Sequence, residues 1–164
     1  MEKMNKEPLV SILMNCFNGE LFLEEALKSV IKQSYSNWEL IFWDNKSTDK
    51  SLEIASAYND QRIKIFTSNE HTNLGKARKN AIKNVTGDYL AFLDVDDIWY
   101  EDKLINQIKL FNDPNVGITF TNSVYFSSKR KKNLYKSNSS FTLNTSKLIT
   151  NYCLSLQSII IDFK

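Results

Sequence analysis

The stretch Tyr89–Asp97, which reads YLAFLDVDD, decides the fold prediction. Its first five residues, Tyr89–Leu93, form an apolar run of strand length that ends directly at three carboxylates within four residues. Strands that are apolar throughout are buried on both faces, as in parallel sheets covered by helices. In such sheets, ligands bind at the edge formed by the carboxyl ends of the strands. The stretch therefore predicts a buried central strand that leads into a polar binding loop.

Strand-length apolar runs alternate with helical patterns on both sides of this stretch. The predicted strands are Leu9–Met14, Trp38–Trp43, Ile63–Thr67, Tyr89–Leu93, Val116–Thr121 and Ser158–Phe163. Apolar residues spaced three and four apart predict helices over residues 22–31, 52–58, 74–85 and 101–111, and Asp49 or Thr48 is expected to cap the second of these. This alternation predicts an α/β, Rossmann-like fold with a mostly parallel sheet and helices on both faces.

Three polar segments follow the first, second and fourth predicted strands: Asn15–Gly19, Asp44–Asp49 and Asp94–Asp97. Because parallel strands place their carboxyl ends at one edge of a sheet, these three loops are expected to converge there. The convergence of the three loops is the structural basis of the predicted site.

Composition excludes several classes of protein. The chain has 164 residues, which fits one domain, with 42% hydrophobic and 24% charged residues, as in ordinary globular proteins. A net charge of +2 does not indicate nucleic-acid binding. The N-terminus, Met1–Pro8, is polar and charged and does not resemble a targeting segment, and no apolar run approaches the roughly 20 residues of a membrane helix. A cytoplasmic setting is expected, with peripheral contact at the cytoplasmic face of a membrane left open.

The two cysteines, Cys16 and Cys153, suggest no disulfide framework, and Cys16 is expected to be a buried free thiol. Residues 127–146 are rich in Ser, Asn and Lys and include the basic run Lys129–Lys132. Such a run is more often a solvated loop than a phosphate or membrane contact.

The acidic turn carries the chemistry. Asp94, Asp96 and Asp97 repel one another unless a positive group lies among them. Mn²⁺ or Mg²⁺ is a suitable partner, because hard divalent cations prefer carboxylate oxygens and use one or two of them together with substrate phosphates. The alternative is a helix cap with solvated acids, which would be favoured for an isolated Asp-x-Asp.

The order of several motifs resembles glycosyltransferase family 2, whose members have the A-type glycosyltransferase fold. The resemblance covers about residues 8–111. It rests on Pro8–Gly19, Ser29-Val30 with Gln33-Ser34-Tyr35, Trp38-Glu39-Leu40, Asp44–Asp49, Asn73-Leu74-Gly75 with Ala77-Arg78, Gly87-Asp88-Tyr89 and Phe92–Asp97.

The resemblance implies a role for each matching residue. Phe17 would flank the nucleobase, Asn15 and Cys16 would offer it backbone contacts, and Arg78 would lie near the phosphates or form a surface ion pair. The implied nucleotide-sugar contacts are Asn15, Cys16, Phe17, Asn18, Asp44, Asn45, Arg78, Asp94 and Val95. Asp96 and Asp94 would bind the metal, with Asp96 the preferred direct ligand.

The sequence also departs from the family pattern. Asn45 stands where many members have an aspartate, and Lys79 where asparagine is usual. The single histidine, His71, is interpreted as a loop residue first and a phosphate contact second. Between Phe111 and Lys164 neither Asp113 nor Asp162 is a convincing catalytic base. The expected division is therefore a tail (1–7), a nucleotide-sugar-binding domain (8–126) and a polar loop with the start of an acceptor-side region (127–164), in a chain that is a fragment of a longer enzyme.

The resemblance implies a metal-dependent enzyme that transfers sugar from a nucleoside diphosphate sugar, with UDP-sugar preferred, to a glycan or lipid-linked acceptor hydroxyl, with inversion, in polysaccharide biosynthesis. The alternative is a non-catalytic nucleotide-sugar-binding module or an inactive fragment that lacks the base. A nucleotidyltransferase would need a Gly-rich loop with Arg and Lys after the first strand, and a receiver-type signalling domain would need an acidic pair there; neither is present.

Overall fold

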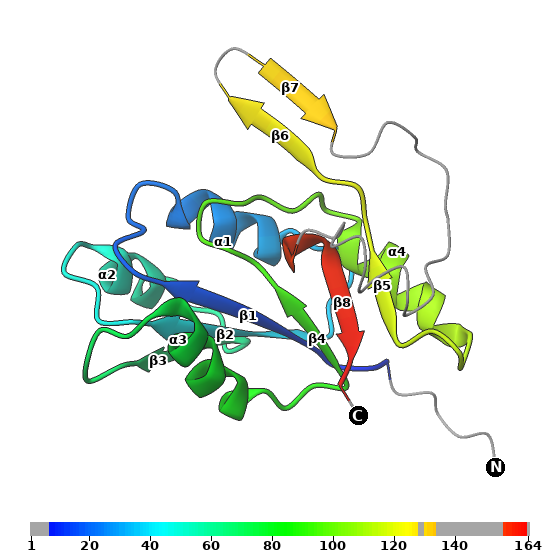
Figure 1. Cartoon of the computed structure of the whole chain (residues 1–164), viewed down its shortest axis with the longest axis horizontal. Coiled ribbons are helices and arrows are strands. Elements are labelled where there is room, and N and C mark those ends of the chain that lie inside the picture. Colours follow the sequence, from blue (N-terminus) through cyan, green and yellow to red (C-terminus); the bar gives the residue numbers. More distant parts are fainter. Residues whose placement is uncertain (1–6, 128–129, 134–155, 164) are drawn as a thin grey trace.

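The structure, a computed structural model, describes residues 7–127, 130–133 and 156–163. Its centre is a six-stranded sheet with the strand order β3-β2-β1-β4-β8-β5 (Figure 1). The strands are β1 (Val10–Cys16), β2 (Trp38–Asp44), β3 (Ile63–Thr67), β4 (Tyr89–Phe92), β5 (Ile118–Phe120) and β8 (Ile159–Asp162). Every strand predicted from the sequence is present.

Strands β1 to β4 run parallel to one another, with Cys16 opposite Asp44 and Leu13 opposite Phe92. The last strand, β8, lies antiparallel between β4 and β5. The division of the chain at residue 126 stays a prediction, but Ile159–Asp162, which the sequence analysis assigned to the second region, lies inside the sheet of the first.

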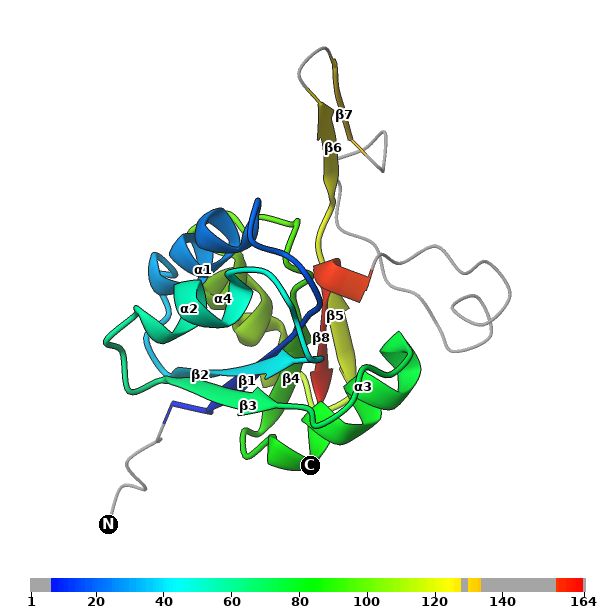
Figure 2. The same ribbon diagram turned by 90° about the vertical axis from the view of Figure 1, so that its left-hand side faces the viewer.

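Helices cover both faces of the sheet, as predicted (Figure 2). Helices α1 (Leu23–Ile31), α2 (Ser51–Ser56) and α4 (Lys103–Ile108) lie on one face and α3 (Leu74–Ala81) on the other. The helices predicted over 74–85 and 101–111 are shorter and continue as the 3₁₀ turns η1 (Ile82–Asn84) and η2 (Lys109–Asn112). Helix α2 has Lys50 at its N-cap position; the predicted cap Asp49 still accepts a hydrogen bond from the Ser51 N–H at 3.0 Å.

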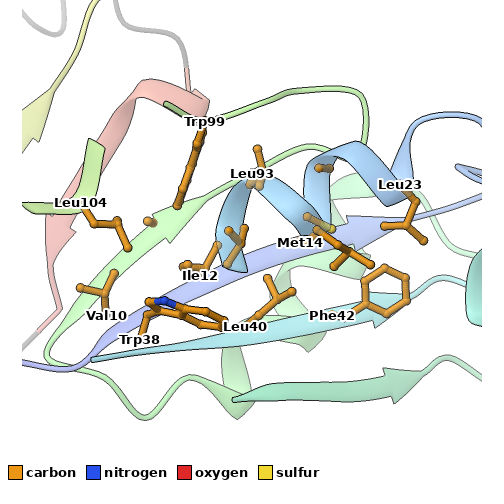
Figure 3. Close-up of a cluster of buried hydrophobic side chains, with 14 of the residues drawn as sticks. Val10, Ile12, Met14, Leu23, Trp38, Leu40, Phe42, Leu93, Trp99 and Leu104 are labelled. Carbon is orange, nitrogen blue, oxygen red and sulfur yellow. The ribbon is translucent and has the colours of Figure 1, made fainter. Parts of the chain in front are cut away.

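The alternation of side chains along β1 divides the core between the two faces. Val10, Ile12 and Met14 belong to the cluster on the α1 face, in which Met14 lies near Leu23 and Phe42 and Val10 lies near Trp38 (Figure 3). Residues at odd positions point toward α3, where Leu13 packs with Ala81 and Leu90. Asn15 is next in this odd-numbered series, so the same alternation turns its side chain toward α3.

A buried polar cluster fixes the amino ends of the strands. Glu39 is 3% exposed, and its carboxylate accepts hydrogen bonds from Ser11, Lys64 and the Thr86 backbone. Burial alone would raise the pKa of Glu39, but these hydrogen bonds lower it overall. The turn that enters β4 is thereby held against β1 and β2, which sets the position of the acidic turn at the other end of β4.

Residues after β5 form a two-stranded ribbon of β6 (Val124–Ser127) and β7 (Arg130–Asn133), which extends away from the main sheet (Figures 1 and 2). The expectation of a solvated loop for the basic run is therefore wrong for Arg130–Lys132, because these residues pair with β6 as a strand. Lys129, residues 134–146 of the polar segment and Cys153 lie outside the described residues. Within the described ranges, no helix combines the length and the apolar character needed to span a bilayer.

Candidate functional site

The loops after β1 and β2 are joined by direct hydrogen bonds. The Asn18 backbone N–H donates to Ser47 Oγ at 3.0 Å, and Asn18 Oδ1 accepts from the Thr48 N–H at 2.8 Å. The Gly19 N–H donates to Ser51 Oγ at 2.8 Å. Asn18 adopts a positive φ of 53°, a conformation that asparagine tolerates better than most residues. The predicted convergence of these two loops is confirmed.

The acidic loop after β4 joins them at Gly19. A Cβ atom on Gly19 would lie 3.0 Å from Val95 Cγ2 and 3.1 Å from Cys16 Sγ. A side chain at this position would therefore need Val95 or Cys16 to shift, so glycine suits the close approach. The three polar loops predicted from the sequence therefore meet at one edge of the sheet, at the carboxyl ends of β1, β2 and β4.

A pocket of about 230 Å³ opens at this edge, between the ends of β1 and β2 and the start of α3. Its lining includes four predicted contacts: Asn15, Cys16, Phe17 and Asn45. The other lining residues are His71, Thr72, Asn73, Leu74 and Ala77. The sequence analysis considered only His71 among these five, as a phosphate contact in second place, although Asn73, Leu74 and Ala77 belong to quoted family motifs. Asn73 caps α3 by accepting from the Lys76 N–H at 2.9 Å.

Phe17 and His71 form an aromatic pair at the pocket, with ring centroids 3.9 Å apart and planes inclined by 42°. Phe17 is 46% exposed. An exposed ring at a pocket is suited to stacking on a flat ligand such as a base. His71, interpreted first as an ordinary loop residue, is therefore part of the pocket wall.

Asn45 is 4% exposed and binds the segment that forms the far wall. Its Nδ2 donates to the Thr72 carbonyl oxygen at 2.6 Å and also lies 3.3 Å from His71 Nδ1. Its Oδ1 accepts from the Thr72 N–H at 3.2 Å and from Thr72 Oγ1 at 3.0 Å. Asn45 thus holds residues 71–72 in place.

Asp44 and Cys16, two of the predicted residues, are buried at the ends of β2 and β1. Asp44 is 3% exposed, and both of its carboxylate oxygens lie 3.2 Å from the Ser47 N–H, which donates to them. Cys16 is a buried free cysteine, as predicted, and burial raises the pKa of its thiol.

The acidic turn lies beside α3. Arg78 Nη2 donates to Asp94 Oδ1 at 2.9 Å, in an ion pair whose side chains are 28% and 36% exposed. Asp96 is exposed, whereas Asp97 is half-buried, and burial together with the neighbouring Asp96 and Asp94 raises the pKa of Asp97. The turn therefore holds more negative charge than Arg78 alone balances.

The donor set of this turn fits a hard cation that is held only partly by protein. Among the residues that the structure describes, no group of three His, Cys, Asp or Glu side chains could enclose a metal. Asp94 and Asp96 alone would supply two carboxylates, and Mg²⁺ or Mn²⁺ commonly completes such a set with water and substrate phosphate oxygens. The site thus suits a cation that binds together with a phosphorylated ligand.

A second pocket, of about 360 Å³, lies beyond Asp97. It is lined by the loop before α4, by residues 121–126 and by the 3₁₀ turn η3 (Leu156–Ser158). The buried Lys103 and the exposed aromatic residues Tyr100, Tyr125 and Phe126 belong to its lining. Asp97, the last residue of the acidic turn, lines this second pocket, which shares no lining residue with the first.

Curated relatives cover most of this chain. It is 32% identical over 154 residues to UDP-Glc:alpha-D-GlcNAc-diphosphoundecaprenol beta-1,3-glucosyltransferase WfgD of Escherichia coli. The matched region covers 94% of this chain and 60% of WfgD. It is 35% identical over 119 residues to the putative teichuronic acid biosynthesis glycosyltransferase TuaG of Bacillus subtilis, at 71% of this chain and 47% of the relative. The chain therefore spans about half of the length of these relatives.

Solved structures share its fold. Residues 1–349 of S. aureus TarS in complex with UDP-GlcNAc give a TM-score of 0.76 at 23% identity, over 93% of this chain and 45% of that one. The mannosyltransferase PcManGT from Pyrobaculum calidifontis, in complex with GDP-Man and Mn²⁺, gives a TM-score of 0.65 at 25% identity, over 71% of this chain and 36% of that one.

The family model described as "Glycosyl transferase family 2" matches residues 11–161, which include the three loops, both pockets and most of the final strand. Together with the A-type fold and the edge where the loops meet, this match shows that the chain belongs to glycosyltransferase family 2.

Proposed function

We propose that this chain binds a nucleoside diphosphate sugar, with the base in the pocket beside Phe17 and the diphosphate at the acidic turn. The observation that carries the proposal is the Arg78–Asp94 ion pair, which joins α3, a wall of the pocket, to the acidic turn. A ligand that extends from the pocket to Asp94 would meet the aromatic ring of Phe17 at one end and a cation site at the other. A nucleotide matches both, because it has a flat base at one end and a diphosphate at the other.

UDP is the nucleotide that we propose. WfgD is named as a UDP-Glc transferase, and the TarS structure contains UDP-GlcNAc. PcManGT contains GDP-Man, so the family fold accommodates a purine nucleotide as well.

Asp96 and Asp94 would hold Mn²⁺ or Mg²⁺, and the ion would supply charge stabilisation for the departing nucleoside diphosphate. The reaction we propose forms a bond between an acceptor hydroxyl oxygen and the anomeric carbon of the sugar. The bond from that carbon to the diphosphate oxygen breaks, its electrons leave with the nucleotide, and a base takes the hydroxyl proton. Attack opposite the leaving group inverts the anomeric configuration.

Neither acid considered as a base in the sequence analysis reaches the acidic turn. Asp162 pairs with Tyr89, at the opposite end of β4 from Asp94. Asp113 lies in an exposed turn after η2 and accepts hydrogen bonds from its neighbour Asn115. Because no base has been assigned in the described part of the chain, a non-catalytic nucleotide-sugar-binding module stays the second candidate function.

The acceptor is proposed to be a glycan or a lipid-linked glycan that approaches from the second pocket, which Asp97 of the acidic turn lines. The printed name of WfgD includes a diphosphoundecaprenol-linked substrate. The β6–β7 ribbon would contact the cytoplasmic face of a membrane, because Tyr125 and Phe126 are 62% and 59% exposed and the sequence of β7 is basic. Sedimentation with vesicles with and without anionic lipid tests this contact.

Calorimetry with Mn²⁺ and a panel of UDP, GDP, CDP and their sugars tests the donor proposal. UDP and UDP-sugars are expected to bind most tightly, and absence of binding to every nucleotide would overturn the proposal. Mass spectrometry of a mixture of donor and lipid-linked acceptor then separates the two candidates, because only the enzyme converts the acceptor to a product heavier by one sugar residue.

A further inference from the structure

The Asn45 carboxamide is occupied mainly by hydrogen bonds to Thr72. Both lone-pair positions of its Oδ1 are used by the Thr72 N–H and hydroxyl, and its Nδ2 donates to the Thr72 carbonyl. Its Nδ2 also lies 3.3 Å from His71 Nδ1, which accepts from it in the tautomer that leaves this ring nitrogen without a proton. A carboxamide can accept two and donate two hydrogen bonds, so Thr72 alone occupies three of these four positions.

The Asn15 carboxamide differs from that of Asn45 in its hydrogen bonding. Its Oδ1 and Nδ2 are both buried from solvent, and neither has a hydrogen-bond partner in the described part of the chain. Buried polar atoms are nearly always paired, and an unpaired buried amide destabilises a protein. Asn15 lines the pocket beside Phe17, so a group that enters the pocket is the available partner for this carboxamide.

We infer that the Asn15 side chain, and not Asn45, reads the hydrogen-bonding edge of the nucleobase. The inference rests on the proposed function, because it names the residue that gives the same pocket its preference for a base. It adds a side-chain role to the backbone contact that the family resemblance implies for Asn15.

The chemistry of a carboxamide matches that of uracil. Its oxygen accepts from the uracil N3–H while its NH₂ donates to the neighbouring carbonyl oxygen, O4 or O2. Phe17, two residues along the chain, would stack on the face of the same ring. Asn45 would act on the base only indirectly, because it positions His71 and Thr72 in the pocket wall.

The test compares three ligands by calorimetry in the presence of Mn²⁺: UDP, N3-methyl-UDP and ribose 5-diphosphate, which lacks the base. Wild type is expected to prefer UDP over both. Asn15→Ala is expected to weaken UDP binding about tenfold, the effect of one to two lost hydrogen bonds, and to leave ribose 5-diphosphate unchanged. Asn15→Asp keeps the size of the side chain and one acceptor, so it should still reject N3-methyl-UDP while it binds UDP more weakly.

Asn45→Ala is the matched variant, because it removes the carboxamide that is already paired. It is expected to lower the melting temperature of the free protein, whereas Asn15→Ala should leave that temperature unchanged or raise it. An unchanged ratio of UDP to ribose 5-diphosphate affinity in both Asn15 variants would overturn the inference while the proposed function stands. Wild-type protein that binds neither UDP nor ribose 5-diphosphate would overturn both.

Discussion

Arg78 Nη2 lies 2.9 Å from Asp94 Oδ1, so a guanidinium group on α3 forms an ion pair with the acidic turn after β4. Arg78 and Asp94 are separated by 16 residues and belong to different elements. The sequence analysis considered two positions for Arg78, near the phosphates or in a surface ion pair. The ion pair is present, and its acidic partner is itself a predicted ligand of the metal, so the two alternatives concern the same site.

This ion pair predicts how the free protein binds a metal. Arg78→Met removes a positive charge and releases an Asp94 oxygen, so Mn²⁺ affinity without nucleotide is expected to rise about fivefold, equivalent to about 1 kcal/mol for a partly exposed pair. Titration calorimetry with MnCl₂ measures the change. Lys76→Met is the control, because Lys76 is on the same helix but pairs with Glu70 in an exposed ion pair. Weaker Mn²⁺ binding by Arg78→Met would contradict this interpretation.

Gly87 predicts a steric effect on stability. A Cβ atom there would lie 2.6 Å from the Leu9 carbonyl oxygen and 2.7 Å from the Ser11 nitrogen, and both are backbone atoms that cannot rotate away. Gly87→Ala is expected to reduce the free energy of unfolding by about 1–3 kcal/mol, measured by urea denaturation.

Gly117→Ala is the matched control, because a Cβ on Gly117 meets no atom within 4 Å. It should change the free energy of unfolding by no more than about 0.5 kcal/mol. Equal stability of the Gly87 and Gly117 variants would show that the β1–β4 contact is less rigid than described.

Lys103 predicts a pH dependence of stability. The residue is 7% exposed, contacts Gln107 and the Ser158 carbonyl oxygen, and burial lowers its pKa to about 7. Between this pKa and the ordinary value of 10.5, the unfolded chain holds the proton that the folded chain has lost. Stability attributable to Lys103 therefore rises with pH across this interval and is lost as pH falls toward 7.

Urea denaturation of wild type and Lys103→Met, at several values between about pH 7 and about pH 9, isolates this contribution. The difference in unfolding free energy between the two proteins should change with pH in favour of wild type as pH rises. A constant difference would mean that Lys103 keeps its proton in the folded protein.

The parallel strands could be predicted because the sequence pattern that indicates a buried strand, and the helix that follows it, are both found in a short stretch of chain. Continuous apolar runs such as Tyr89–Leu93 mark buried strands, and the alternation with helices fixes them as parallel. The position of β8 was not predicted, because a strand's pairing partners depend on contacts with residues about 40 and 70 positions earlier in the chain, Phe120 and Tyr89 among them.

The site was predicted where it lies directly after a strand and missed where tertiary packing supplies the wall. Asn15 and Asn45 follow the alternation of β1 and β2 to the end of the sheet, so their place was readable from the sequence. Thr72 and Ala77 reach the pocket only because α3 packs on the sheet, and neither residue type has a chemistry that indicates a ligand. The hydrogen bonds that distinguish Asn15 from Asn45 likewise depend on that packing.

Binding of UDP with and without Mn²⁺, in wild type and Asp96→Ala, tests most directly the claim that a metal at the acidic turn joins the protein to a nucleotide diphosphate. The exposed Asp113→Ala variant is the control. Removal of Mn²⁺ or of the Asp96 carboxylate is expected to weaken UDP binding by about thirtyfold or more, with Asp113→Ala unchanged. Equal UDP affinity in all of these conditions would contradict the account.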